Sequence, residues 1–531
     1  MKKQHFFGSS LIIIAVLAFL GYMLLSSFGG KASQSTKGLE IAQNAEIVEL
    51  KDGDVYDLEM TYVKKNINGK DIRMMAYNGS IPGPTIKVKQ GSTVTVNLIN
   101  KSDIPTTLHS HGIRMENQYD GVPHMTQNQV DPGESFKYKL NFQDAGVFWY
   151  HPHIHEEYAQ NIGAYGNFLV TSNDPNYLSP VNKEIPLMIS DILLGPSGTP
   201  SFDIKNPSHI LMGRYGNVYL VNGTNSYTST VKSGDVIRYF LTNASNARPL
   251  RIAIPGAQIK LVGADNGKLE REVFIENVTI GPSERAIIDV YFPKSGNYTL
   301  ENSTPAKSTV IGNIIAVDGV DDFEGDSISY YNKFKTLRTN YDVIKDIDSY
   351  RNSFNKVSDK KITLFADIAN MEGMHHASEG MQMLSGPSKD IDLSGGKFDG
   401  IEWEDEMMVM NSASNKDFVK WNIRDDKTGA VNEKINWAFK KGDQVKIEIY
   451  NDPKSPHPMQ HPFHIHGNRF LVLSENGIKN TNMVWKDTAN VPIGSRVDIL
   501  LDASNIGDWM AHCHISEHLV GGMMFNYSVI E

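Results

Sequence analysis

Apolar residues in the body of the chain recur in short runs separated by turns. Residues 85–88, 93–98, 236–241 and 445–450 alternate apolar with other side chains at a period of two. Such alternation is typical of β-strands, which send successive side chains to opposite faces. Long segments with the 3.6-residue period of a helix are scarce after residue 30. The pattern therefore predicts an all-β body made of sandwiches or barrels.

A weak internal repeat divides this body. Residues 89–94, 232–237 and 440–445 each carry a turn followed by an alternating strand, and each copy then reaches an Asn. Three copies predict three related Greek-key β-sandwich domains. We place the segments as follows: a linker at 31–44, domains at 45–175, 180–320 and 361–531, and a charged connecting segment at 321–360 that runs over the surface.

The N-terminus has the features of an export segment. Lys2 and Lys3 precede an uncharged stretch from residue 6 to residue 30, and residues 11–25 are almost wholly apolar. At about 1.5 Å per residue this stretch is long enough for the roughly 30 Å hydrocarbon core of a bilayer. Residues 1–30 are therefore a signal peptide or a signal anchor. Residues 6–28 would attach the protein to the membrane, with its body outside.

Composition and charge narrow the function. The net charge is −10, which argues against nucleic acid as a partner because phosphate binding needs a basic surface. One Cys among 531 residues excludes an intrachain disulfide. An exported chain without disulfides fits a bacterial cell-envelope protein, either membrane-anchored or secreted. We expect a monomer.

The single cysteine lies between two histidines. The tripeptide is His512-Cys513-His514, and His518 and Met523 follow it. Three more clusters lie upstream: His109-Ser110-His111, His151-Pro152-His153, and His461, His464 and His466. One His pair can occur in a loop by chance, but four clusters around a lone Cys indicate a metal site.

The residue types in these clusters distinguish copper from zinc. Zinc could use His-x-His pairs, but it does not explain a Cys combined with a Met. Cys513, His518 and Met523, with one further His, match a blue-copper site of two imidazoles, one thiolate and a weak axial thioether. The composition of the clusters therefore favours copper.

These motifs resemble those of the three-domain multicopper oxidases, the family of laccases and bacterial cuprous oxidases. The resemblance covers residues 45–531, and residues 221–223, 243–248 and 282–285 extend it through the middle domain. It implies that the three β-sandwich domains are cupredoxin-like and that they hold four copper ions. The type 1 ion would be bound by His461, Cys513, His518 and axial Met523, and the type 2 ion by His109 and His464. The type 3 pair would be bound by two sets: His111, His151 and His514; His153, His466 and His512.

The resemblance also implies a reaction. Single electrons would be taken from a substrate at type 1 copper, and O2 would be reduced to water at the trinuclear cluster. Asp120 lies where the family keeps a proton-relay carboxylate, although an Asp before Gly121 also suits a turn. Relatives often carry an acid after the second type 1 His, whereas this chain has Leu519 there and Glu517 on the other side. Glu517 is either a substitute in the proton route or a solvated charge.

One segment bears on the substrate. Residues 371–383 contain six residues with soft or imidazole side chains: Met371, Met374, His375, His376, Met381 and Met383. Thioethers and imidazoles are good Cu(I) ligands, although a Met-bearing loop packed on the core is the alternative. Met407, Met408 and Met410 alternate as in a core strand, and Met459 suits either the type 1 site or the core.

Several functions remain open. The first is oxidation of Cu(I) in copper tolerance. The second is a laccase-like oxidation of phenols, aromatic amines, Fe(II) or Mn(II). A non-enzymatic copper carrier or scaffold is the third, although scaffold relatives lose the ligands that this chain keeps. A copper nitrite reductase fits poorly, because it has two domains and no trinuclear histidine set.

Overall fold

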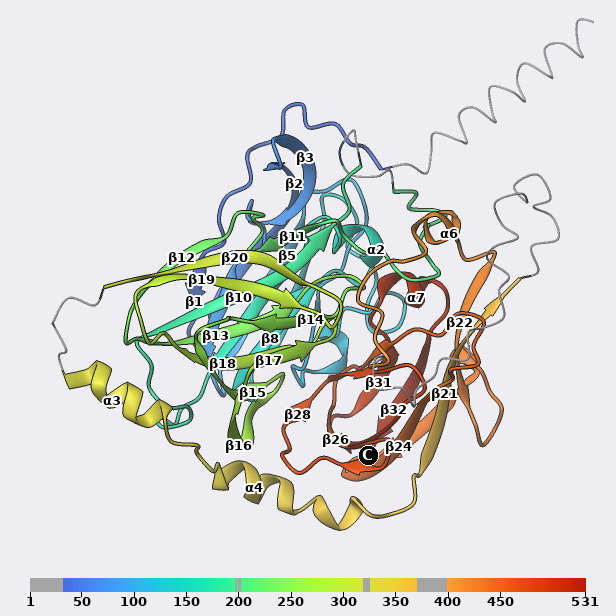
Figure 1. Ribbon diagram of the computed structural model, residues 1–531. Coiled ribbons are helices and arrows are strands. Elements are labelled where there is room, and N and C mark those ends of the chain that lie inside the picture. The colour runs from blue at the N-terminus through green and yellow to red at the C-terminus, as the bar shows by residue number, and fades with distance from the viewer. Residues whose placement is uncertain (1–31, 196–197, 199–201, 319–324, 370–398) are drawn as a thin grey trace, which may run out of the picture.

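The computed structural model of the protein describes residues 32–195, 198, 202–318, 325–369 and 399–531. Strands dominate the described residues, and they form six sheets that follow one another in three pairs along the chain. Figure 1 shows the pairs in blue to cyan, green and orange to red. The predicted all-β fold class is confirmed, whereas the exact domain boundaries stay a prediction.

The first pair combines the sheets β1-β4-β9-β8-β6 and β3-β2-β5-β7. Its strands are β1 (Ile47–Glu49), β2 (Val55–Ile67), β3 (Lys70–Tyr77), β4 (Thr85–Lys89), β5 (Thr93–Asn100), β6 (His109–Ser110), β7 (Ser135–Asn141), β8 (Gly146–His151) and β9 (Gly166–Thr171). On β5 the alternation predicted from sequence is observed, since Val94, Val96 and Leu98 are fully buried and the residues between them are not. The core of this unit therefore lies between its two sheets.

The middle pair combines the sheets β11-β10-β13-β18-β15-β16 and β12-β20-β19-β14-β17. Its strands are β10 (Lys183–Ile192), β11 (Val218–Val221), β12 (Thr228–Lys232), β13 (Val236–Asn243), β14 (Leu250–Ala253), β15 (Gln258–Ala264), β16 (Gly267–Ile275), β17 (Asn277–Ile280), β18 (Arg285–Tyr291), β19 (Gly296–Ser303) and β20 (Ser308–Val317). Unlike β5, strand β13 is buried along its whole length. The reason is tertiary: Phe240 on its outer face packs with Val147 and Leu169 of the first unit.

The third pair combines the sheets β22-β21-β24-β30-β26-β27, in which β28 also pairs with β26, and β23-β32-β31-β25-β29. Its strands are β21 (Lys360–Ile368), β22 (Val419–Asp425), β23 (Asn436–Lys440), β24 (Asp443–Asn451), β25 (His461–Ile465), β26 (Arg469–Glu475), β27 (Ile478–Lys479), β28 (Trp485–Lys486), β29 (Thr488–Val491), β30 (Arg496–Ala503), β31 (Gly507–Cys513) and β32 (Met524–Ile530). Its core includes Cys513 and Met523 among aliphatic and aromatic side chains.

Short helices join and cover the sheets. They are α2 (Glu156–Ala159), α3 (Gly325–Phe334), α4 (Tyr341–Asp348), α6 (Met408–Ala413) and α7 (Ser516–Val520). Helices α3 and α4 belong to the connecting segment and run from the middle sheets to the third pair (Figure 1). Ile347 of α4 is fully buried against Leu471 and Leu500, so this connection is docked on the third unit.

One strand prediction is wrong. Met408 and Met410 lie in helix α6, which Met407 precedes, and Met408 is 61% exposed. The helix is fixed by tertiary contacts instead of by apolar alternation. Its Asn411 side chain accepts from the backbone N–H of Met212 at 3.0 Å and donates to the carbonyl of Gly213 at 2.8 Å.

No helix within the described ranges is both long and apolar enough to cross a membrane. The predicted leader, residues 1–30, lies outside those ranges, as does the 371–383 segment.

Contact between the first two units generates a stability prediction. Gly223 has φ +72°, and a Cβ there would lie 2.0 Å from the carbonyl oxygen of Ile81 in the first unit. Gly223→Ala should lower the unfolding midpoint through backbone strain of about 1–2 kcal/mol together with this clash. Gly91→Ala is the matched control, because Gly91 has φ +86° and open space around it. Equal midpoints for the two variants in thermal unfolding would contradict the clash.

Candidate metal centres

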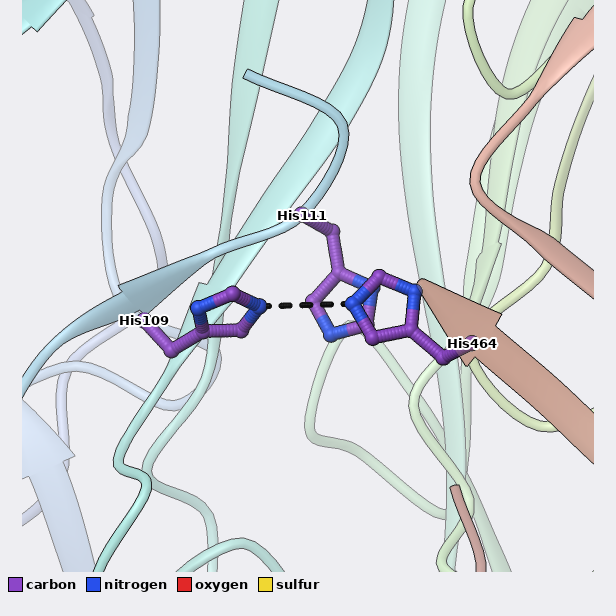
Figure 2. A group of neighbouring side chains, drawn as sticks. All are labelled: His109, His111 and His464. Atoms are coloured by element: carbon purple, nitrogen blue, oxygen red, sulfur yellow. Dashed lines mark hydrogen bonds between the residues drawn. The ribbon is translucent and has the colours of Figure 1, made fainter. Parts of the chain in front are cut away.

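Strand pairing within the first and third units brings histidine clusters together in each unit. In the first unit β6 pairs with β8, so that His109 lies opposite His151. In the third unit β25 pairs with β31, so that His464 lies opposite His512. The two pairs meet between the units, and Figure 2 shows His464 reaching the imidazoles of His109 and His111 from a different strand.

The ligand atoms gather in compact groups. Within each group they lie within 4.8 Å of one another, and every member is buried. The groups are His109, His111 and His464; His111, His151 and His514; His153, His466 and His512; His461, Cys513 and His518; and His109, Asp120 and His466.

Hydrogen bonds fix which nitrogen of these rings carries the proton. Four imidazoles donate from Nδ1 to backbone carbonyls at 2.7–2.9 Å: His109 to Asp120, His151 to Pro152, His464 to Asp487 and His512 to Cys513. His466 donates from Nδ1 to Oδ2 of Asp120 at 2.9 Å. A carbonyl can only accept, so the Nε2 atom of each neutral ring carries a lone pair.

These lone pairs face one another. Nε2 of His466 lies 3.0 Å from Nε2 of His512, and Nε2 of His109 lies 3.4 Å from Nε2 of His464. Two bare acceptors cannot hydrogen-bond to each other, so a proton or a cation must lie between them.

Protonation does not supply that cation at neutral pH. Burial, reinforced by neighbouring imidazoles, holds the pKa of His466 and of His512 well below that of a free histidine. Burial and then the neighbouring imidazoles do the same for His111, His151 and His514. Converging neutral imidazoles, five of them with Nδ1 held by an acceptor, are a donor set that suits copper, and the residues fit it.

The cysteine forms a separate centre. Sγ of Cys513 lies 3.5 Å from Nδ1 of His461 and 3.5 Å from Nδ1 of His518, and those two nitrogens are 3.3 Å apart. Met523 is fully buried in the same cluster, and its carbonyl accepts from the backbone N–H of Cys513 at 3.1 Å. One thiol and two imidazoles thus converge, as a trigonal blue-copper site needs.

Burial also suits this centre to a metal. It raises the pKa of the Cys513 thiol above its ordinary value and lowers the pKa of His461 to about 3, with help from His457. Without a metal the thiol stays protonated, and a bound copper ion would displace that proton. The chemistry of this donor set fits copper as well.

The two carboxylates singled out in the sequence lie in different surroundings. Asp120 is fully buried and accepts from His466, so it orients a histidine of the central site. Glu517 is buried on α7, where its carboxylate accepts from the Asn246 side chain and faces Arg214 at 3.9 Å. Burial raises the pKa of Glu517 to about 7, against the lowering effect of Arg214. Glu517 is therefore not a solvated surface charge.

Sequence reasoning missed three neighbours of the histidines. Asp487 accepts from His464 through its carbonyl and places Oδ1 3.5 Å from Nδ1 of His111. Trp421 stacks on His518 with ring centroids 4.1 Å apart. Oε1 of Glu156 lies 3.0 Å from Nδ1 of His153. Of these three neighbours, only Glu156 could have been found from its spacing in the sequence, because it follows His153 by three residues.

The charge state of Asp487 is set by its partners. Burial alone would raise the pKa of its carboxyl, but the Arg285 guanidinium and His464 outweigh burial and hold it well below the ordinary range. Asp487 is thus an anion beside the histidines.

Of the remaining candidates from the sequence, the structure describes only Met459. Met459 is fully buried in the core cluster that contains Cys513. The six residues of the Met/His segment lie outside the described residues.

Comparison with known proteins identifies similar chains. Family models described as multicopper oxidase match residues 59–175 and 402–531. The multicopper oxidase mco of Staphylococcus haemolyticus is 28% identical over 85% of this chain and 82% of its own length. Copper resistance protein A of Escherichia coli is 23% identical over 97% of this chain and 98% of its own. A multicopper oxidase structure from Campylobacter jejuni, described as a metallo-oxidase, has a TM-score of 0.64 at 24% identity, with 94% and 99% of the two chains covered.

The low pKa values of the buried histidines predict how metal-free protein responds to acid. Below about pH 6.5 the histidines of the unfolded chain bind protons, whereas the buried histidines of the folded protein stay neutral. The free energy of unfolding is therefore highest above this pH and decreases as the pH falls below it. Each such histidine contributes up to about 1.4 kcal/mol per pH unit. We expect the unfolding midpoint of metal-free protein to fall between pH 7.5 and 5.5, and to fall less in His461→Gln. A midpoint that is flat over this range in both proteins would be inconsistent with neutral buried imidazoles.

Proposed function

We propose that this chain, a copper-dependent oxidoreductase of the multicopper oxidase family, oxidises Cu(I) outside the cytoplasmic membrane as part of copper tolerance. The observation that carries the copper assignment is the set of Nε2 lone pairs that face one another at 3.0–3.4 Å. Three parts of the proposal follow: the ligands, the proton route and the electron donor.

We assign the ligands by group. His461, Cys513 and His518, together with Met523, would hold the type 1 ion, and His109 with His464 would hold the type 2 ion. The type 3 ions would be held by His111, His151 and His514, and by His153, His466 and His512. The type 1 set comes from the third unit alone, whereas each of the other sets joins residues of the first and third units.

Copper bound at these residues supplies one-electron oxidation of the donor and, with four electrons and four protons, reduction of O2 to two waters. The protein supplies the path between the two centres. Cys513 is bonded through the backbone to His512 and His514, whose rings belong to two different groups of the central site. An electron that leaves the cysteine sulfur therefore has a short covalent route in both directions.

We propose that Asp120 serves the proton route. Its Oδ2 accepts from His466, and its Oδ1 lies 3.4 Å from Nδ1 of His109, so the carboxylate spans two of the groups. Glu517 is the second candidate. It is buried on α7 beside Asn246 and Arg214. This position supports a role in the proton route, because Leu519 replaces the acid that relatives often carry there.

Cu(I) is the electron donor that we favour. The Met and His residues of segment 371–383 are soft ligands, and Met459 is buried in the cluster that holds Cys513. One relative, which matches 97% of this chain, is named a copper resistance protein. A laccase-like oxidation of phenols, aromatic amines, Fe(II) or Mn(II) is the second candidate, and another relative, from Arthroderma benhamiae, is named a laccase.

The proposed location rests on the N-terminal sequence. Basic Lys2 and Lys3 before the apolar stretch 6–28 favour export and attachment of the body to the outer face of the membrane. Removal of residues 1–30 should therefore give a protein that keeps its activity but no longer sediments with membranes.

The donor is tested by oxygen uptake. Copper-loaded protein without residues 1–30 is offered Cu(I) and a phenol as competing donors, and each rate is corrected for the reaction without enzyme. We expect a strong preference for Cu(I). A preference for the phenol would make the protein a laccase. No uptake with either donor despite full copper occupancy would point to a copper carrier.

A deletion of 371–383 sharpens this test. Selective loss of Cu(I) oxidation, with phenol oxidation retained, would give the segment its role in Cu(I) handling. An unchanged Cu(I) rate would remove that role.

Asp120→Asn tests the proton route. The amide keeps the shape of the side chain but cannot carry a proton between the two histidines, so we expect oxygen reduction to fall by about 100-fold or more. The blue colour should stay intact, because Asp120 lies in none of the groups that contain Cys513. Asp131→Asn, on the exposed surface of the same unit, is the control. Wild-type turnover in Asp120→Asn would exclude the relay.

A further inference from the structure

The middle unit contributes no histidine to the groups described above, yet one of its side chains reaches them. We propose that Arg285, the first residue of β18, is a positioning residue for the central copper site: through Asp487 it holds the imidazoles of His464 and His111 in place. The proposal rests on the copper centre assigned under the proposed function.

Arg285 is held by a complete set of acceptors. Nη1 donates to Oδ1 of Asp487 at 2.8 Å, and Nη2 donates to Oδ2 of the same carboxylate. Nε donates to the carbonyl of Val147 at 3.0 Å, and Nη1 also donates to that of Ser283 at 3.0 Å. Both charged side chains are fully buried. A planar fork that meets a carboxylate through two parallel bonds fixes the orientation of that carboxylate as well as its charge.

Asp487 passes this orientation to two histidines. Its carbonyl accepts from Nδ1 of His464 at 2.9 Å, and its Oδ1 lies 3.5 Å from Nδ1 of His464 and from Nδ1 of His111. The hydroxyl of the next residue, Thr488, donates to the same Oδ1 at 2.8 Å. A tilt of this carboxylate would therefore move the Oδ1 atom, which faces two imidazoles assigned to different ions.

The backbone next to His111 is shaped for the carboxylate. Gly112 has φ +74°, and a Cβ there would lie 2.5 Å from Oδ2 of Asp487 and 2.9 Å from Oδ1 of Asn266. Asn266 in turn donates to the carbonyl of Gly112 at 3.2 Å and accepts from Nη2 of Arg285 at 3.4 Å. The arginine, the carboxylate and the chain that carries His111 thus form one packed unit.

A purely structural role is the competing explanation, because a buried ion pair between the middle and third units also joins them. The molecule offers a matched comparison. Arg238 on β13 donates in the same two-pronged way to Asp289, at 2.8 and 3.0 Å, and is equally buried. Asp289 faces no histidine group, so Arg238 reports the cost of disturbing a buried pair alone.

The test compares Arg285→Lys with Arg238→Lys in the copper-loaded protein. Lysine keeps the positive charge but cannot bond the carboxylate with two parallel donors. We expect Arg285→Lys to change the electron paramagnetic resonance signal of the copper outside the blue site and to lower oxygen consumption by about 10–100-fold. Its blue colour should persist. Arg238→Lys should lower the unfolding midpoint and leave the resonance signal unchanged.

Two results would overturn the proposal: a wild-type resonance signal in Arg285→Lys, or the same spectral change in both variants. If Arg285→Lys does not fold, Asp487→Asn replaces it, with the same expected change and the same overturning result. Failure of the copper assignment is distinguishable, because wild-type protein would then bind no copper at the histidine groups, and failure of the Cu(I) assignment alone would leave the wild-type resonance signal in place.

Discussion

The central site depends on one arrangement: neutral imidazoles whose Nδ1 protons are given to acceptors and whose Nε2 lone pairs point at one another. His466 and His512 are 3.0 Å apart through such atoms, and His109 and His464 are 3.4 Å apart. Burial holds the pKa of His464, His466 and His512 below the ordinary value, so the repulsion is not relieved by protons at neutral pH. The fold therefore arranges these donors so that a metal ion can bind between them.

Keeping these lone pairs together requires the first and third units to be rigidly apposed. Within each unit the register of a short strand pair sets the spacing, with His109 opposite His151 and His464 opposite His512. Between the units the apposition is set by buried contacts. The middle unit takes part, since Phe240 packs on the first unit and Arg285 bonds to Asp487 of the third. The middle unit, which contains no histidine group, thus helps to hold the other two units in position.

The second centre is organised differently. Cys513 and Met523 lie in the core of the third unit, and Trp421 stacks on His518. The ligands of this site come from one unit alone, and the core around them is mainly apolar. The central site lies between units, and its neighbours include charged groups such as Asp120 and Asp487. Electron acceptance in an apolar pocket and proton-coupled chemistry beside carboxylates are consistent with these two environments.

The sequence by itself determined the fold class and the candidate metal set. Period-two alternation specifies strands wherever one face is buried, as on β5, and four His clusters around one Cys specify a donor chemistry without reference to a fold. Alternation failed at Met407–Met410, where contacts of Asn411 with Met212 and Gly213 fix a helix. Only the tertiary structure decided that Asp487, Trp421 and Arg285 serve the histidines. Their partners are distant in sequence, and no local pattern encodes a contact between residues that far apart along the chain.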